Sequence, residues 1–223
     1  MVRDGIYYGI WFTFAGAALW FVFNLYWGLP CFLVGAFCMY FFRDPERQIP
    51  EGPVAVSAGD GQVVQIRPLD NGGHRVSVFL NIFNVHVNRI PVGGVVTANE
   101  YRHGKFKMAN LEDASAENEQ NSLTINSAGS EVIVTQIAGL IARRIVCDTK
   151  RGDNVEKGQR YGLIKFGSRM DVYLGPEWQL TVQLGDKVKG GSSILARRAE
   201  IELTVPRGDR VQASSSMQGD PAE

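Results

Sequence analysis

The chain has 223 residues, of which 45% are hydrophobic, a size that fits one domain with a small appendage and excludes a long multidomain enzyme. Its 23 basic and 23 acidic residues give a formal net charge of +0, which offers no positive field for a polyanion and argues against a nucleic-acid partner. The three cysteines, Cys31, Cys38 and Cys147, form no CxxC pair. This pattern favours a reducing compartment and argues against a disulfide framework or a structural zinc site.

The first part of the chain is uncharged over a long stretch. No Asp, Glu, Lys, Arg or His occurs between Gly5 and Phe42, which is typical of a membrane segment. At 1.5 Å per residue, one straight helix of this length would exceed a hydrocarbon core of about 30 Å. We therefore expect a break at Gly28-Leu29-Pro30, with a first helix near residues 5–26 and a second near 31–42.

Residues 1–42 are thus predicted to anchor the chain in a membrane, either as a hairpin or as one span with an interfacial piece. Arg3 precedes the apolar run, whereas Arg43 and Arg47 follow it. Basic residues on both flanks favour a hairpin with both ends in the cytoplasm, so we expect the inner membrane with the remaining domain on its cytoplasmic side. The alternative is the buried helical hairpin of a soluble protein.

Residues 43–205 are predicted to form a β-rich domain. Short runs of alternating apolar residues, such as 63–66, 75–80 and 131–134, are separated by Gly, Asn and Asp, as expected of strands. The range 136–144 is the one helical candidate, and Gly139 weakens it. Residues 206–223 lack apolar periodicity, which predicts a disordered tail.

One internal repeat is visible, because Gly152-Asp153-Asn154-Val155 recurs as Gly185-Asp186-Lys187-Val188 in the pattern GDxVxxG. Gly and Asp are turn residues, and the valine is expected to point inward before the next strand begins. Two such corners resemble those of lipoyl and biotinyl carrier domains in fold type. The predicted fold class is therefore mainly β, a carrier-like sandwich or barrel with an N-terminal hydrophobic helical hairpin.

The candidate chemical groups are few. His86 lies in the run FNVHVNR, His74 and His103 have the surroundings of loop residues, and Asp60 lies in AGDG. A single histidine in a strand is more often structural than catalytic, and a hairpin turn explains the AGDG segment fully. Cys147 fits a small core residue better than a nucleophile.

A longer set of motifs favours a catalytic interpretation of these residues. The segment YGLIKFGSRMDVY at 161–173 occurs with FFRDPER at 41–47, FNVHVNR at 83–89, ENE at 117–119 and IAGLIARRIV at 137–146. Together and in this order they resemble the short-form phosphatidylserine decarboxylase family. The resemblance runs from the membrane segment to about Leu203, so that only the tail lies outside it.

The resemblance implies a proenzyme that cuts itself between Gly167 and Ser168 into a longer β chain and a short α chain, which stay associated. Ser168 would become a pyruvoyl group, and glycine before it would leave its carbonyl open to attack. The activity implied is conversion of phosphatidylserine to phosphatidylethanolamine and carbon dioxide through a Schiff base, without PLP or a metal. A second Gly-Ser bond, at Gly191-Ser192-Ser193, is disfavoured because it lies on the second GDxVxxG corner.

The family's other functional residues match this chain only in part. Long-form members of the family have two histidines three residues apart, where this chain has His86 and Arg89. His86 is expected to protonate the substrate α-carbon, and Arg89 to bind the lipid phosphate or the substrate carboxylate. Asp60 matches the family's Asp-Gly turn and is expected to orient a catalytic base. The self-cleavage base stays open between His86 and Asp60 acting through water.

Three alternatives remain. The same chemistry could act on an ether-linked archaeal lipid, which would make the chain an archaetidylserine decarboxylase. A membrane-anchored carrier module without catalysis would explain the two corners, but such carriers modify an exposed lysine, and Lys165 lies between two apolar residues. The third is a structural membrane adaptor. A homodimer formed through a sheet edge is a further expectation.

Overall fold

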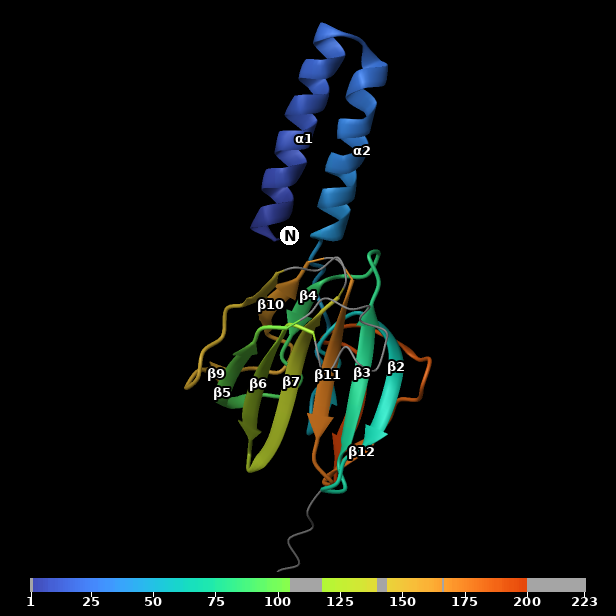
Figure 1. The fold of residues 1–223 in the computed structure, drawn as a ribbon. Helices are drawn as coiled ribbons and strands as arrows, with labels where there is room; N and C mark the ends of the chain where they lie inside the picture. The colour runs from blue at the N-terminus through green and yellow to red at the C-terminus, as the bar shows by residue number, and fades with distance from the viewer. Residues whose placement is uncertain (1, 105–117, 140–143, 166, 200–223) are drawn as a thin grey trace, which may run out of the picture.

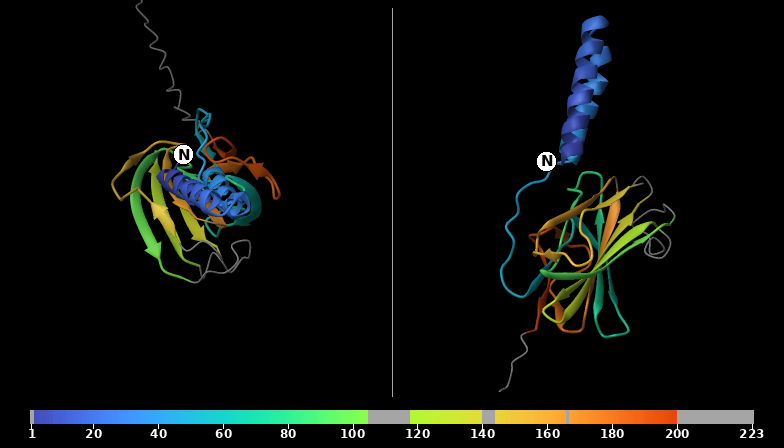
Figure 2. Two further views of the ribbon diagram at one scale, coloured as in Figure 1. Left: turned by 90° about the horizontal axis from the view of Figure 1, so that it is seen from above. Right: turned by 90° about the vertical axis from the view of Figure 1, so that its left-hand side faces the viewer.

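The computed structural model describes residues 2–104, 118–139, 144–165 and 167–199. Glu117, the central part of the 137–146 motif and the predicted tail lie outside these residues. A helical hairpin stands on one end of a β domain (Figure 1). A linker of residues 42–53 leaves the hairpin and runs down one side of the domain to its first strand (Figure 2).

The hairpin consists of α1 (Arg3–Val22) and α2 (Leu25–Phe41). The predicted hairpin is confirmed, but the predicted break at Gly28-Leu29-Pro30 is wrong, because Pro30 lies inside α2. The break falls at Asn24, whose side chain accepts a hydrogen bond from the Tyr26 amide at 3.0 Å and caps the second helix. A good cap fixes the helix start, whereas a proline near the start removes only one hydrogen bond of the ladder.

The two helices approach each other along a seam of glycines. A Cβ at Gly28 would lie 2.5 Å from the Gly16 carbonyl oxygen, so only glycine allows this separation. The large apolar side chains face outward instead, with Trp11 71% and Phe21 94% exposed. The buried hairpin of a soluble protein is therefore not what the structure shows. Helix α1 is long and apolar enough to cross a membrane, and α2 is shorter.

The rest of the described chain is built from strands, as predicted. Residues 136–138 of the one helical candidate complete a strand, and residues 140–143 lie outside the described part. The strands are β1 (Val54–Val56), β2 (Gly61–Pro68), β3 (His74–Leu80), β4 (Val87–Arg89), β5 (Gly94–Arg102), β6 (Gln120–Ser127), β7 (Ser130–Ala138), β8 (Ile145–Cys147), β9 (Asn154–Val155), β10 (Arg160–Ile164), β11 (Ser168–Leu174), β12 (Trp178–Leu180), β13 (Lys187–Val188) and β14 (Ile194–Arg198).

These strands form one curled eight-stranded sheet, ordered β13-β2-β3-β11-β7-β6-β5-β9, and two three-stranded sheets, β1-β14-β12 and β4-β10-β8 (Figure 1). The eight-stranded sheet curls into a half-barrel (Figure 2), and its strands supply most of the residues of the main hydrophobic core. The mainly β class is confirmed. This arrangement does not confirm the likeness to carrier domains, which stays a prediction.

The two GDxVxxG corners lie at opposite edges of the large sheet, where β9 pairs with β5 and β13 pairs with β2. Gly152 and Gly185 have φ angles of 94° and 93°. In each corner the aspartate accepts a hydrogen bond from the backbone N–H three residues earlier, at 2.7 Å for Asp153 and 2.8 Å for Asp186. The following valines are buried. The turn prediction for the repeat is thus confirmed in detail.

Candidate active site

The Gly167-Ser168 bond lies at the start of β11, a central strand of the large sheet. Ser168 pairs with Leu80 on one side and with Ala138 on the other, and both neighbours belong to the hydrophobic core. Ser168 is fully buried, and its Oγ has no hydrogen-bond partner among the described residues. A buried hydroxyl without a partner is rare in folded proteins and points to a chemical role.

Gly167 has a backbone conformation that glycine adopts most readily. Its φ is +60°, in the left-handed region, while a Cβ placed on it would meet no atom within 4 Å, its chain neighbours aside. A side chain at this position would therefore be strained by the backbone rather than by crowding. This is a second reason for glycine before the serine, beside the open carbonyl expected from the sequence.

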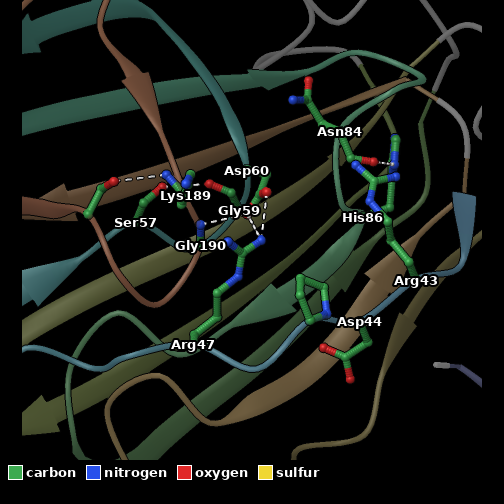
Figure 3. Close-up of polar contacts among 12 residues, drawn as sticks. Arg43, Asp44, Arg47, Ser57, Gly59, Asp60, Asn84, His86, Lys189 and Gly190 are labelled. Carbon is green, nitrogen blue, oxygen red and sulfur yellow. Dashed lines mark hydrogen bonds and ion pairs between the residues drawn. The ribbon is translucent and has the colours of Figure 1, made fainter. Parts of the chain in front are cut away.

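His86 comes from the segment between β4 and β3, the strand whose last residue, Leu80, pairs with Ser168. The Ile164 N–H, at the end of β10 and shortly before Ser168, donates to the His86 carbonyl at 3.4 Å. The imidazole is fully buried and packs on the Phe41 ring, with 4.3 Å between ring centroids. Its Nδ1 lies 3.0 Å from the Asn84 carbonyl oxygen (Figure 3). A carbonyl only accepts, so Nδ1 carries the proton and Nε2 carries the lone pair.

The electrostatic state of His86 follows from this burial. Desolvation lowers the pKa of His86 from 6.5 to about 4, the hydrogen bond to Asn84 opposes the shift, and the Arg43 charge adds to it. Nε2 has no hydrogen-bond partner among the described residues. His86 is therefore a neutral imidazole at neutral pH with a free acceptor nitrogen, which is the state of a general base.

Asp60 is held by two partners. Its carboxylate accepts from Arg47 at 3.0 and 2.8 Å and from the Gly190 N–H at 2.8 Å (Figure 3). It thereby joins the linker after α2 to the second GDxVxxG corner. Its neighbour Gly59 packs close to Leu80, the strand partner of Ser168, since a Cβ on Gly59 would lie 3.1 Å from a methyl group of that leucine.

Arg89 is also held within the domain. Its guanidinium donates to Asp44 at 3.0 Å, to the Gly158 carbonyl at 3.0 Å and to the Pro45 carbonyl at 3.1 Å. Burial lowers the pKa of Arg89, and the Asp44 charge opposes this shift. In this conformation Arg89 fastens the linker to the first GDxVxxG corner, which ends at Gly158.

The linker motif has a role that the sequence reasoning missed. Arg43 donates to the carbonyls of Tyr40 and Phe83 at 2.8 and 2.7 Å, while Asp44 and Arg47 pair with Arg89 and Asp60. Glu46 pairs with Arg160 at the surface. The alternating charges directly after the apolar run were visible in the sequence, but the residues with which these charges pair are distant in sequence.

A buried polar cluster inside the half-barrel was also missed. Gln136 faces the core, two residues along β7 from the partner of Ser168, and its Nε2 donates to Asn88 Oδ1 at 2.9 Å. The Tyr161 hydroxyl is buried and, among the described residues, has no partner. Amide side chains at alternating core positions were the sequence signal. The cluster gives the interior near Ser168 hydrogen-bonding capacity.

The remaining candidates lie elsewhere. His74 begins β3 rather than a loop and pairs with Leu174, at the opposite end of β11 from Ser168. His103 is 90% exposed and stacks edge-on against Tyr101. In the second corner, Ser193 Oγ accepts from the Lys189 N–H at 2.9 Å. Cys147 is half-buried, and burial raises its pKa. No cluster of three metal-ligating side chains occurs in the part of the chain that the structure describes.

Comparison with known proteins gives consistent matches. The family model described as phosphatidylserine decarboxylase matches residues 34–196. A phosphatidylserine decarboxylase proenzyme of Solibacter usitatus is 51% identical over 200 residues, which cover 90% of this chain and 98% of that protein. Proteins of the same name from Cupriavidus taiwanensis and Ehrlichia chaffeensis are 48% and 43% identical, covering 78% and 85% of this chain and 84% and 88% of their own.

Proposed function

The chain belongs to the phosphatidylserine decarboxylase family, and from that premise we propose that it converts phosphatidylserine to phosphatidylethanolamine and carbon dioxide with a pyruvoyl group made from its own Ser168. The observation that carries the proposal is the Ser168 hydroxyl, which is buried without a described partner directly after a glycine in the left-handed conformation. Ser77 on the neighbouring strand β3 is likewise buried without a described partner, so the left-handed glycine directly before Ser168 is what distinguishes this serine.

The proposed maturation uses atoms of the Gly167-Ser168 bond itself. Ser168 Oγ attacks the Gly167 carbonyl carbon, so that a C–O bond forms, the peptide C–N bond breaks and the hydroxyl proton passes to the freed nitrogen. A base then removes the α-proton of residue 168 and the Cβ–Oγ bond breaks, so that the Gly167 carboxylate leaves with the former serine oxygen and residue 168 becomes dehydroalanine. Its imine tautomer is hydrolysed, so that water supplies the ketone oxygen and the nitrogen leaves as ammonia.

We propose His86 as the base for the first proton transfer. It is neutral at pH 7, its free Nε2 can accept a proton, and its backbone is hydrogen-bonded to Ile164 at the end of the strand preceding the cleavage bond. In turnover the same nitrogen, once protonated, delivers a proton to the substrate α-carbon. The choice of His86 over Asp60 rests on the two partners that already occupy the Asp60 carboxylate.

The pyruvoyl group supplies a ketone that binds the substrate amine covalently and accepts the electron pair released when carbon dioxide leaves. The residues nearby fit a polar headgroup, since Tyr161 and Asn88 each have a buried polar atom without a partner in the described residues. Asp60 keeps its proposed orienting role through Arg47 and Gly190. Arg89 remains the proposed anion-binding group. This role requires its guanidinium to keep its hydrogen bond to Asp44 while it also contacts the substrate.

The two chains are expected to stay together after cleavage. The short chain would contain β11, which is paired with β3 and β7 of the long chain along nearly its whole length. It would also contain β13, paired with β2, and β14, paired with β1. A homodimer remains a prediction, and the edge strands β9 and β13 have only two residues each, which limits edge-to-edge pairing.

Membrane anchoring is part of the same proposal. At 1.5 Å per residue, α1 with 20 residues spans about 30 Å, the thickness of a hydrocarbon core. Its outward aromatic side chains suit lipid contact, and the diacyl substrate lies in the same bilayer. Basic residues beside the domain, Arg3 and Arg43, favour the inner membrane with the domain on the cytoplasmic side.

Replacement of the serine tests the function directly. The Ser168→Ala protein should run as a single chain on a denaturing gel and release no carbon dioxide from carboxyl-labelled phosphatidylserine. The matched controls Ser192→Ala and Ser193→Ala should be cleaved and active like the wild type. Cleavage of Ser168→Ala, or loss of cleavage in either control, would contradict the proposed site.

A further inference from the structure

We propose that the turn at residues 81–84 is a second membrane contact, in which Ile82 and Phe83 insert into the headgroup region of an anionic bilayer beside the hairpin. This wedge, defined as residues 81–84, would set the depth of His86 relative to the lipid headgroups. The proposal rests on the membrane anchoring proposed above and adds a surface of the β domain to it.

The wedge is closed by its own polar side chains. The Phe83 N–H donates to Asn81 Oδ1 and the Asn81 N–H donates to Asn84 Oδ1, both at 2.9 Å. The two apolar residues between these asparagines are left on the outside, with Ile82 37% and Phe83 60% exposed. A rigid turn that presents neighbouring aliphatic and aromatic side chains to the outside is typical of an interaction surface.

The position of the wedge identifies the bilayer as its partner. The Phe83 carbonyl accepts from Arg43 at 2.7 Å and from the Tyr40 hydroxyl at 3.4 Å. Tyr40 lies in the last turn of α2, and the Arg43 guanidinium lies 3.8 Å from the centre of its ring. Tyrosine and arginine at the end of an apolar helix mark the membrane interface. The wedge is therefore held at the level where the helix leaves the membrane.

The charges nearby favour an anionic surface. Arg43 is joined at this end of the domain by Lys165, whose Nζ lies 5.8 Å from the centre of the Phe42 ring. Phe41 and Phe42 pack with Val85 and Val87 in a hydrophobic cluster directly beneath. Basic groups around an apolar contact strengthen binding to anionic lipids, which include the proposed substrate.

The wedge is coupled to the candidate active site. Its last residue, Asn84, accepts the hydrogen bond of His86 Nδ1 through its carbonyl (Figure 3). The position of the imidazole therefore follows the position of the wedge. Insertion of Ile82 and Phe83 would hold His86 at the depth of the lipid headgroup and not above it.

The depth of the wedge can be measured on the full chain by spin labelling. With the three native cysteines replaced by alanine, a nitroxide at Phe83→Cys is compared with one at Asp70→Cys, an exposed position in the turn at the other end of β3. In vesicles of phosphatidylcholine and phosphatidylglycerol, oxygen should relax the label at 83 more than a water-soluble nickel chelate does, and the reverse should hold at 70. A label at 83 that is as accessible to the nickel chelate as that at 70 would overturn the proposal.

The functional consequence is tested with two forms of substrate. Replacing Ile82 and Phe83 by serine should lower the decarboxylation rate on bilayer phosphatidylserine about tenfold, on the scale of losing two partly buried apolar side chains. It should leave the rate on a monomeric short-chain phosphatidylserine unchanged. Phe83→Leu should retain most of the bilayer rate, and Leu184→Ser, at a 68% exposed position in the second corner, should behave as wild type.

The outcomes separate the two proposals. A serine double variant with the wild-type rate on bilayers, or with equal losses on both substrates, would contradict the wedge. A wild-type protein that acts on neither form of phosphatidylserine would contradict the proposed function, while the spin-label result would still decide the membrane contact.

Discussion

The depressed pKa of His86 predicts an unusual pH dependence of self-cleavage. The reaction needs the lone pair of Nε2, and burial lowers the pKa of His86 from 6.5 to about 4. The cleavage rate should therefore be constant from about pH 8 to pH 5, fall to half near pH 4 and decrease tenfold per pH unit below that. At pH 5 a base with an ordinary histidine pKa would be neutral in only about 3% of molecules, so the two cases differ about thirtyfold in rate.

The assay follows freshly translated proenzyme after transfer to buffers between pH 8 and pH 3, with cleavage read on denaturing gels and folding checked by near-UV circular dichroism at each pH. Arg43→Gln is a useful companion, because removing the Arg43 charge should raise the pKa of His86 and move the midpoint upward. A wild-type midpoint near pH 6.5, or full cleavage of a folded His86→Ala proenzyme, would refute His86 as the base.

Further predictions concern stability, the glycine, the linker and turnover. The pKa of His86 is lower in the folded than in the unfolded chain, so protonation of His86 favours unfolding. The free energy of unfolding should keep its full value above pH 6.5 and fall by up to about 3 kcal/mol as the pH decreases through about 4. Urea unfolding of wild type against His86→Gln should show this difference. Gly167→Ala should slow cleavage about 5- to 30-fold on gels without abolishing it, since the left-handed φ costs about 1–2 kcal/mol; unchanged cleavage would contradict the strain. Asp44→Asn should lower the free energy of unfolding by about 3 kcal/mol because it removes the carboxylate that pairs with buried Arg89 and also with Arg160, whereas Glu46→Gln, at a 91% exposed position, should leave it unchanged in the same titration. In the small fraction of His86→Ala protein that is cleaved slowly without this base, turnover per cleaved chain should be about 100-fold slower than in wild type, while His74→Ala and His103→Ala stay near wild type; wild-type turnover per cleaved His86→Ala chain would exclude His86 as the proton donor in turnover.

The sequence was most informative at positions where the type of residue itself determines the local backbone conformation. Gly167-Ser168 stood in a recognisable segment, and the corners at Gly152 and Gly185 were predicted because glycine and aspartate control the backbone locally. The hairpin was predicted from the length of the uncharged run and from the basic residues on both of its flanks. Its turn was misplaced because proline is a conspicuous helix breaker, whereas the cap at Asn24 is a single side-chain hydrogen bond.

What the sequence could not supply is the pairing of distant residues. Arg89 was expected to bind an anion, and it was not foreseeable that Asp44, far away in sequence, contacts its guanidinium. The strand order could not be predicted either, because β11 lies between β3 and β7 and its place depends on packing of the whole sheet. Gln136 lies in β7 and Asn88 in β4, and although their amide side chains were visible in the sequence, nothing in it indicated that the two would meet in a hydrogen bond.

Mass spectrometry of the purified full-length protein tests whether Ser168 becomes the reactive group. We expect two chains, the longer ending at Gly167 and the shorter beginning at residue 168 with a mass lower than that of a serine-initiated chain by one ammonia. The shorter chain should resist Edman degradation because a pyruvoyl group has no amine. A single intact chain with full decarboxylase activity, or a short chain beginning with an unmodified serine, would show that Ser168 is not the source of the reactive group.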